Sequence, residues 1–358
     1  MADWGSYFFG VEIEAIALPV KVGHNKQREA YFNRLVAKLQ SYGVSAVAEQ
    51  HGQRYSKHPE HYDKWWITRD GSLGEPENSR GNDIDMFWSA WGEVFEEPED
   101  STLCGCHVHV SPSPQQEFSL SQLRRIAFGV VRYEPLVAEL LPAHRNDNKY
   151  CRLNTEKSYE LNRIMSHTSR GMDLIAVKHR LDQVADKYQL RNLMQQSYEP
   201  KKDRYVLWNF DNARPGKSGS VEFRGGPGIR DSEQTKTWVS FVVAFIHLCL
   251  SQDVELYPLE PDSSTMANFW RRIRQAGKAT GVKDNLPSDW TAMAVSSSCY
   301  YSDDSDDDSV VGKSDFEESD FDDSSDSEFD ISSDTGSDSD DYESEDEYEY
   351  SESVYYYY

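Results

Sequence analysis

Three short segments of the sequence each carry two ionisable side chains at alternate positions. The pairs are Glu12 and Glu14, His107 and His109, and Glu222 and Arg224. Alternate residues of a β-strand point to the same side, and the immediate neighbours of each pair are mostly apolar. The three segments therefore predict strands with one face in the core and the other face lined by carboxylates and imidazoles.

A divalent cation is the ligand that such a face favours. Neighbouring carboxylates repel one another unless a cation lies between them. Oxygen ligands with few imidazoles suit Mg²⁺ or Mn²⁺ better than a structural zinc ion. A closed zinc site on Cys104, Cys106 and the two histidines is disfavoured, because the chain has no second Cys/His pair at zinc-finger or ribbon spacing.

Each motif also has a plainer interpretation. An E-x-E pair alone is usually the solvated side of a sheet, and Glu222 with Arg224 could be a surface ion pair of little energetic consequence. Gly225 and Gly226 begin a G-G-P-G run that is typical of a turn. Consecutive backbone N–H groups in such a run also bind phosphate, so the two glycines are candidate phosphate-binding residues.

Strand-like and helix-like segments interleave around these motifs. Strands are expected at residues 6–18, 64–73, 104–114, 204–210 and 220–228. Helices are expected at residues 26–43, 119–141, 235–250 and 265–277, with a kink at Pro135 in the second of them. A mixed helical region follows that second helix and extends to about residue 197. The strands are half polar, which favours an α+β fold with an antiparallel sheet over a doubly wound parallel one.

The charge of the chain is concentrated in its last part. Residues 301–358 hold 24 acids and one lysine; removing them from totals of 62 acids and 37 basic residues leaves 38 and 36, a net charge of −2 instead of −25. A near-neutral body excludes a generic nucleic-acid binder. We expect a folded domain at 1–295 and a disordered Ser/Asp/Glu/Tyr-rich acidic tail at 296–358, with a basic protein as its expected partner.

Other sequence features bear on the compartment. No apolar run reaches the roughly 18 residues of a membrane-spanning helix, and residues 1–14 show no signal-peptide pattern. Five cysteines at irregular spacing indicate reduced thiols rather than a disulfide framework. The expected location is intracellular, in the cytoplasm or the nucleus, with no secretion and no membrane partner.

Six motifs, in this order, resemble those of a known family. They are F-G-V-E-I-E at 9–14, W-I-T-R-D-G-S-L at 66–73, C-G-C-H-V-H-V-S-P at 104–112, H-R-N-D-N-K-Y-C at 144–151, W-N-F at 208–210 and S-V-E-F-R-G-G-P at 220–227. This set resembles the amidoligases of fungal type, which are grouped with glutamine synthetase and glutamate–cysteine ligase. The resemblance covers roughly residues 7–255.

The resemblance implies a fold and a reaction. The fold is a curved antiparallel sheet of the glutamine synthetase-like catalytic type, with helices packed outside. The reaction is ATP- and Mg²⁺- (or Mn²⁺-) dependent amide formation, in which a small-molecule or peptide carboxylate becomes an acyl phosphate that an amine then attacks.

The resemblance also implies roles for individual residues. The implied metal ligands are Glu12, Glu14, His109 and Glu222, the implied nucleotide-binding residues are His107, Gly225 and Gly226, and the implied catalytic residues are Arg224, Arg145 and Asn148. Which of the two histidines supplies the metal-binding imidazole stays open. Asp70 lies in a D-G turn pattern and has either a structural or a functional role.

One departure from the family leaves alternatives open. Relatives carry an E-x-x-S-P segment with an active-site Glu after the D-G-S motif, and no clean match to it exists at residues 74–91, where Glu75 or Glu77 could substitute. Loss of that segment would remove a metal ligand and a strand. A catalytically degraded relative acting as a binding module is therefore one alternative, and a metal-dependent hydrolase using the same face is another.

Overall fold

A computed structural model describes residues 7–20, 28–48, 64–68, 81–99, 101, 104–112, 116–146, 148–167, 172–251, 265–295 and 353–357. The strands are β1 (Phe8–Ile16), β2 (Ala46–Ala48), β3 (Trp65–Thr68), β4 (Gly105–Ser111), β5 (Trp208–Asn209), β6 (Val221–Pro227) and β7 (Ser353–Tyr357). The α-helices are α1 (Arg28–Ser41), α2 (Gly81–Gly92), α3 (Leu120–Leu140), α4 (Ala143–Asn146), α5 (Asn154–Lys157), α6 (Tyr159–His167), α7 (Met172–Asp182), α8 (Lys187–Gln195), α9 (Ser232–Leu250), α11 (Met266–Ala279) and α12 (Thr291–Val295).

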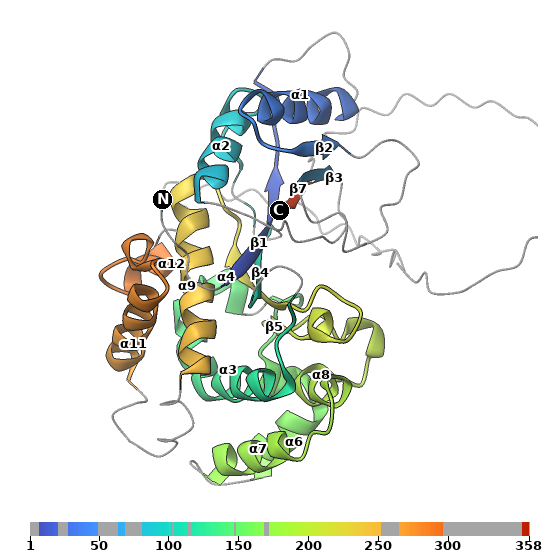
Figure 1. The fold of residues 1–358 in the computed structure, drawn as a ribbon, viewed down its shortest axis with the longest axis vertical. Helices are drawn as coiled ribbons and strands as arrows, with labels where there is room; N and C mark the ends of the chain where they lie inside the picture. Colours follow the sequence, from blue (N-terminus) through green and yellow to red (C-terminus); the bar gives the residue numbers. More distant parts are fainter. Residues whose placement is uncertain are drawn as a thin grey trace, which may run out of the picture. The chain divides into compact units, whose positions relative to one another are not determined.

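The described strands form one sheet in the order β2-β3-β7-β1-β4-β6-β5 (Figure 1). Every neighbouring pair is antiparallel except β2 and β3, which are parallel. The prediction of an α+β fold with a curved antiparallel sheet is confirmed. The likeness of this sheet to that of glutamine synthetase stays a prediction.

One face of the sheet packs against helix α9 and forms the core. Val11, Val108 and Phe223, which alternate with the ionisable residues of their strands, are fully buried. Phe223 stacks on Trp238 of α9 with ring centroids 5.9 Å apart. Trp208, opposite Phe223 on β5, stacks on Phe245 of α9 at 4.5 Å. These contacts hold the ionisable side chains of the same strands on the other face.

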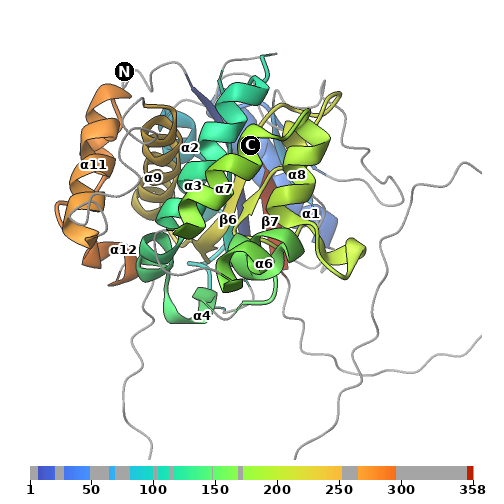
Figure 2. The same cartoon turned by 90° about the horizontal axis from the view of Figure 1, so that it is seen from below.

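Local sequence signals set the ends of the helices that support the sheet. Ser119 and Gln122 form a capping box at the start of α3, with the Gln122 N–H donating to Ser119 Oγ at 3.2 Å. Helix α3 then runs through Pro135 to Leu140. Helix α1 ends before Gly43, whose φ of 82° closes the predicted helix in the left-handed conformation that glycine favours. Helices α3, α9 and α11 pack against one another (Figure 2).

A buried asparagine joins the short helices to the edge of the sheet. The Asn154 side chain donates to the carbonyls of Met194, at the end of α8, and of Trp208, in β5, at 3.0 and 2.8 Å. Its Oδ1 accepts from the Trp208 N–H at 3.0 Å. The predicted strand at 204–210 is only two residues long, and this side chain substitutes for the ladder bonds that a longer strand would make.

Strand β7 differs from the sequence-based expectation. Its backbone pairs with both β1 and β3, so that Tyr357 lies opposite Glu12 and Trp66. We expected a disordered tail from residue 296 onward, whereas the backbone of Ser353–Tyr357 pairs with two strands of the sheet. Residues 296–352 lie outside the described residues, so the expected division of the chain at residue 295 stays a prediction.

Two further observations bear on the sequence analysis. None of the described helices combines the length and the apolar character that crossing a bilayer requires. The four described cysteines, Cys104, Cys106, Cys151 and Cys249, are buried free thiols.

Candidate metal and active site

Strands β1, β4 and β6 lie side by side, and their register aligns the three ionisable pairs. Glu12 on β1 lies opposite His107 on β4, and His109 on β4 lies opposite Glu222 on β6. Residues that are directly opposite in neighbouring antiparallel strands point to the same face. The three strands therefore present these side chains on one face, as their alternation predicts.

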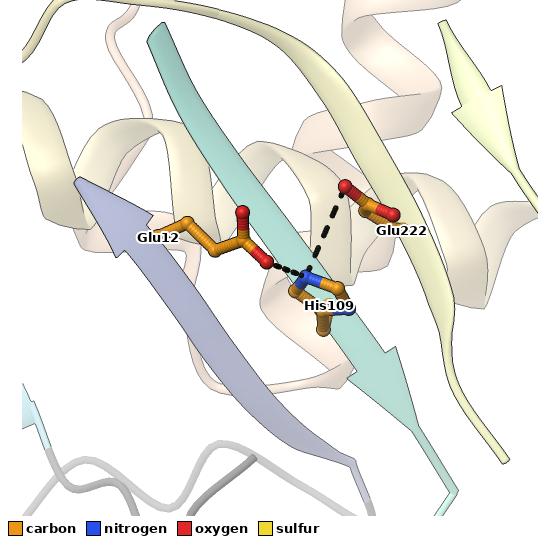
Figure 3. Close-up of side chains that lie close together, drawn as sticks. All are labelled: Glu12, His109 and Glu222. Atoms are coloured by element: carbon orange, nitrogen blue, oxygen red, sulfur yellow. Dashed lines mark hydrogen bonds and ion pairs between the residues drawn. The ribbon is translucent and has the colours of Figure 1, made fainter. Parts of the chain in front are cut away.

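Three of these side chains converge on one point. Figure 3 shows Glu12, His109 and Glu222 directed toward one another from the three strands. His109 Nε2 lies 2.9 Å from Glu12 Oε1 and 4.0 Å from Glu222 Oε1. One ligand atom from each residue lies within 4.8 Å of the other two. The three residues are 5%, 4% and 3% exposed, so the group is enclosed by protein.

Glu12 accepts hydrogen bonds from both imidazoles. His107 Nδ1 lies 2.7 Å from Glu12 Oε2, and His109 Nε2 approaches the other oxygen. Burial would raise the pKa of Glu12, but the hydrogen bonds from the two histidines outweigh burial and hold the pKa well below its usual range. Glu12 is therefore an ionised carboxylate in a nearly dry environment.

Glu222 and Arg224 form a partly buried ion pair on β6, in which Glu222 is the buried partner. Arg224 Nη1 donates to Glu222 Oε1 at 2.6 Å. Burial would raise the pKa of Glu222, but the interactions with Arg224, His109 and His107 together outweigh burial and lower this pKa. Burial would lower the pKa of Arg224, whereas the carboxylates of Glu222, Glu12 and Glu14 raise it. Both partners are therefore charged.

Glu14 lies beside the group without joining it. Its Oε1 is 3.7 Å from His107 Nε2, on the far side of the imidazole from Glu12. Burial raises the pKa of Glu14, and the opposing charges of His107 and Arg224 do not reverse this effect. The compact donor set thus contains Glu12, His109 and Glu222 of the predicted metal ligands, with Glu14 and His107 adjacent.

The chemistry and spacing of this donor set fit a divalent cation. Ligand atoms bound about 2.1 Å from one ion are about 3 Å apart when adjacent and about 4.2 Å apart when opposite. The separations of 2.9 and 4.0 Å from His109 Nε2 fall within these limits. Two carboxylates with one imidazole suit Mn²⁺ well and Mg²⁺ less well. Cys106 points to the core face, so the disfavoured zinc set of thiols and imidazoles does not assemble.

Arg145, another predicted catalytic residue, lies at the end of this face. Arg145 is 2% exposed, and its Nη2 donates to the Arg224 carbonyl oxygen at 2.6 Å while packing on Gly105. Its Nε has no hydrogen-bond partner among the described residues. Asn148 instead accepts the Tyr150 N–H at 2.9 Å, which stabilises its own turn. Arg145 is thus placed to contact a ligand, whereas the contact of Asn148 is local.

Gly225 and Gly226 do not form the turn suggested by their sequence. Both continue strand β6, where Gly226 pairs with Cys106. A Cβ on Gly226 would lie 2.5 Å from the Cys106 carbonyl oxygen, and one on Gly225 would lie 2.5 Å from Leu207 Cδ1. Close packing accounts for both glycines, and the predicted phosphate cradle finds no support in this geometry.

Sequence reasoning missed the side chains behind the donor set. Asn209 donates to Glu222 Oε2 at 2.8 Å. Asn212 Nδ2 and Ser220 Oγ lie 3.4 and 3.5 Å from His109 Nδ1. Asn209 was visible only as the centre of W-N-F, and nothing in the sequence marks Asn212 or Ser220. Asp70, Glu75 and Glu77 lie outside the described residues.

Comparison with known proteins finds a match to a family model. Residues 81–246 match the family model described as "Putative amidoligase enzyme". Over this region, which is a little under half of the chain, the sequence is similar to the amidoligase family. The matched region contains His109, Glu222 and Arg224. Glu12 lies outside the matched region, and the pairing of β1 with β4 brings it next to these residues. A comparison with curated proteins finds no match.

Proposed function

We propose that this protein joins a carboxylate to an amine, using ATP and Mg²⁺ or Mn²⁺, through an acyl-phosphate intermediate. The observation that carries the proposal is the convergence of Glu12, His109 and Glu222 from three adjacent strands, with Arg224 beside them. The match to the amidoligase family model supports a ligase in general. The proposed substrates are a carboxylate and an amine on a small molecule or peptide, and the proposed location is the cytoplasm or the nucleus.

The charge of the site fits this chemistry. Glu12, Glu14 and Glu222 face Arg224 and Arg145, so the carboxylates outnumber the arginines. A divalent cation would balance the carboxylates and leave the guanidinium groups available to an anion. When bound, the cation would polarise the phosphate oxygens and neutralise charge on the transferred phosphoryl group.

The residues of the chain would act by holding and stabilising charge. Glu12, His109 and Glu222 would hold the cation. Arg224, fixed by its bond to Glu222, would stabilise negative charge on the transferred group. Arg145, with a buried Nε that makes no hydrogen bond among the described residues, would contact a phosphate or the substrate carboxylate.

The bond changes follow in two steps. An oxygen of the substrate carboxylate attacks the γ-phosphorus, and the bond to ADP breaks. The amine nitrogen then attacks the acyl carbon, inorganic phosphate leaves, and the nitrogen loses a proton as the amide forms. The enclosure of the donor group favours this sequence, because water would otherwise hydrolyse the acyl phosphate.

ATP binding by the full-length chain tests the proposal. Calorimetric titration with ATP and Mg²⁺ should show binding that Glu12→Gln weakens at least tenfold, because one metal ligand is lost. Asp85→Asn, which removes an exposed carboxylate paired with Lys236, is the matched control and should bind as the wild type does. Absence of ATP binding by the wild type would refute the ligase. Binding that Glu12→Gln leaves unchanged would refute the metal assignment.

Hydroxylamine separates the ligase from the two alternatives. As a small amine it intercepts an acyl phosphate and gives a stable hydroxamate, so a ligase supplied with a panel of amino acids and peptides should release ADP and form hydroxamate together. A hydrolase would cleave an ester or amide without ADP release. A degraded relative would bind ATP and release neither product.

A further inference from the structure

Two buried amide side chains, Asn209 and Gln195, form a chain of hydrogen bonds that ends at Glu222. Asn209 Nδ2 donates to Glu222 Oε2 at 2.8 Å, and Gln195 Nε2 donates to Asn209 Oδ1 at 2.8 Å. Gln195 is fully buried and Asn209 is 5% exposed. Asn209 belongs to β5, and Gln195 is the last residue of α8. We call Gln195 and Asn209 the amide relay; it runs from a helix to a proposed metal ligand.

Backbone donors fix the direction of every hydrogen bond in the amide relay. The Phe210 N–H donates to Gln195 Oε1 at 2.7 Å, and the Asp211 N–H donates to Asn209 Oδ1 at 2.9 Å. A backbone N–H can only donate, so both side-chain oxygens must be the accepting ends. Asn209 must therefore turn its NH₂ group toward Glu222, and an amide flip would break several bonds.

This direction determines the state and orientation of Glu222. Asn209 donates to Oε2 and Arg224 donates to Oε1, so the carboxyl group accepts on both oxygens. Oε1 is the oxygen directed at the donor set, 3.6 Å from His107 Nδ1 and 4.0 Å from His109 Nε2. Without the Asn209 bond, rotation of the carboxyl group would exchange its two oxygens and leave a buried acceptor without a partner.

We infer that Asn209 and Gln195 are positioning residues that hold Glu222 Oε1 toward the cation. The inference rests on the proposed function, since it assigns a role to residues behind the proposed metal ligand. Partners that orient a ligand in this way typically contribute 10- to 100-fold to metal affinity. Asn209 contacts Glu222 directly, whereas Gln195 acts through Asn209, so the effect should decrease along the amide relay.

Mn²⁺ titration of the full-length chain by calorimetry tests this inference without requiring a substrate. Asn209→Leu, which has a similar volume and no N–H, should raise the Mn²⁺ dissociation constant by roughly 10- to 100-fold. Gln195→Met should raise it less, by up to about tenfold, because Asn209 keeps its bond from the Asp211 N–H. The control is Asn285→Leu, which removes an amide that donates to Ser240 Oγ at 3.1 Å on helix α9.

The outcomes separate positioning from a general loss of stability. Thermal unfolding of each variant identifies the folded protein, and Asn285→Leu should keep Mn²⁺ affinity within twofold of the wild type. A folded Asn209→Leu chain with wild-type Mn²⁺ affinity would overturn the inference, as would equal losses in Asn209→Leu and Asn285→Leu. If Asn209→Leu does not fold, Gln195→Met decides by the same criterion. Absence of Mn²⁺ binding by the wild type would overturn the metal site itself and the amide relay's role with it.

Discussion

Glu134 should make the stability of this protein depend on pH near neutrality. It lies in α3 at 1% exposure and accepts hydrogen bonds from the Asn154 N–H at 2.6 Å, the Thr155 N–H at 3.2 Å and the Thr155 hydroxyl. Burial raises the pKa of Glu134 to about 7, although these hydrogen bonds oppose the change. Glu134, which lies outside the donor set, therefore changes its protonation state near neutral pH.

The sign and size of the effect follow from proton linkage. The ordinary pKa of the carboxyl group is 4.5, against about 7 in the folded chain. Between these values the folded state binds a proton that the unfolded state has lost, so the free energy of unfolding falls as the pH rises. The contribution is fully present below pH 4.5, is lost as the pH passes about 7, and amounts to roughly 3 kcal/mol.

Urea unfolding of the wild type and of Glu134→Gln measures this contribution. Glutamine is neutral at every pH, so the variant lacks the titration while other groups cancel in the comparison. From pH 4.5 to pH 8 the variant should gain stability relative to the wild type by roughly 3 kcal/mol. Any constant offset reflects altered hydrogen bonds with Thr155. A difference that is independent of pH, or that shrinks as the pH rises, would refute the reasoning.

Three further predictions concern packing and pairing, each measured as the free energy of urea unfolding. Gly226→Ala should lose about 1–3 kcal/mol, because the new Cβ would lie 2.5 Å from the Cys106 carbonyl oxygen; no loss would contradict this packing. Arg191→Ala should lose about 2 kcal/mol, since it leaves the buried Asp203 without its cation; Arg191→Lys should recover part. Tyr356→Pro should lose about 3 kcal/mol by removing a ladder N–H from a strand paired on both sides; a loss equal to that of Tyr356→Thr would argue against the pairing.

The composition of the polar face could be predicted because it is a local property of each strand. The alternation of Glu12 with Val11, and of His109 with Val108, requires only the two-residue period of a strand. Phe223 likewise assigns Glu222 to the opposite face. The α+β class follows from the same half-polar pattern, and the end of α1 follows from Gly43.

Neighbour relations between distant segments could not be predicted in this way. No local signal states that β4 lies between β1 and β6, which decides that Glu12 and Glu222 meet at His109. The G-G run was misinterpreted because a turn and a close strand contact both require glycine. Gln195 escaped notice because a glutamine at the end of a helix carries no sign of its partner in β5.

The pairing of β7 changes the topology of the acidic part of the chain. Helix α12 ends at Val295 and β7 begins at Ser353, so the 57 residues between them are tethered to the same body at both ends. Residues on both sides of this segment therefore belong to one body, since β7 pairs with β1 and β3. A single proteolytic cut within the segment would open this ring and leave both halves attached to the sheet-bearing body.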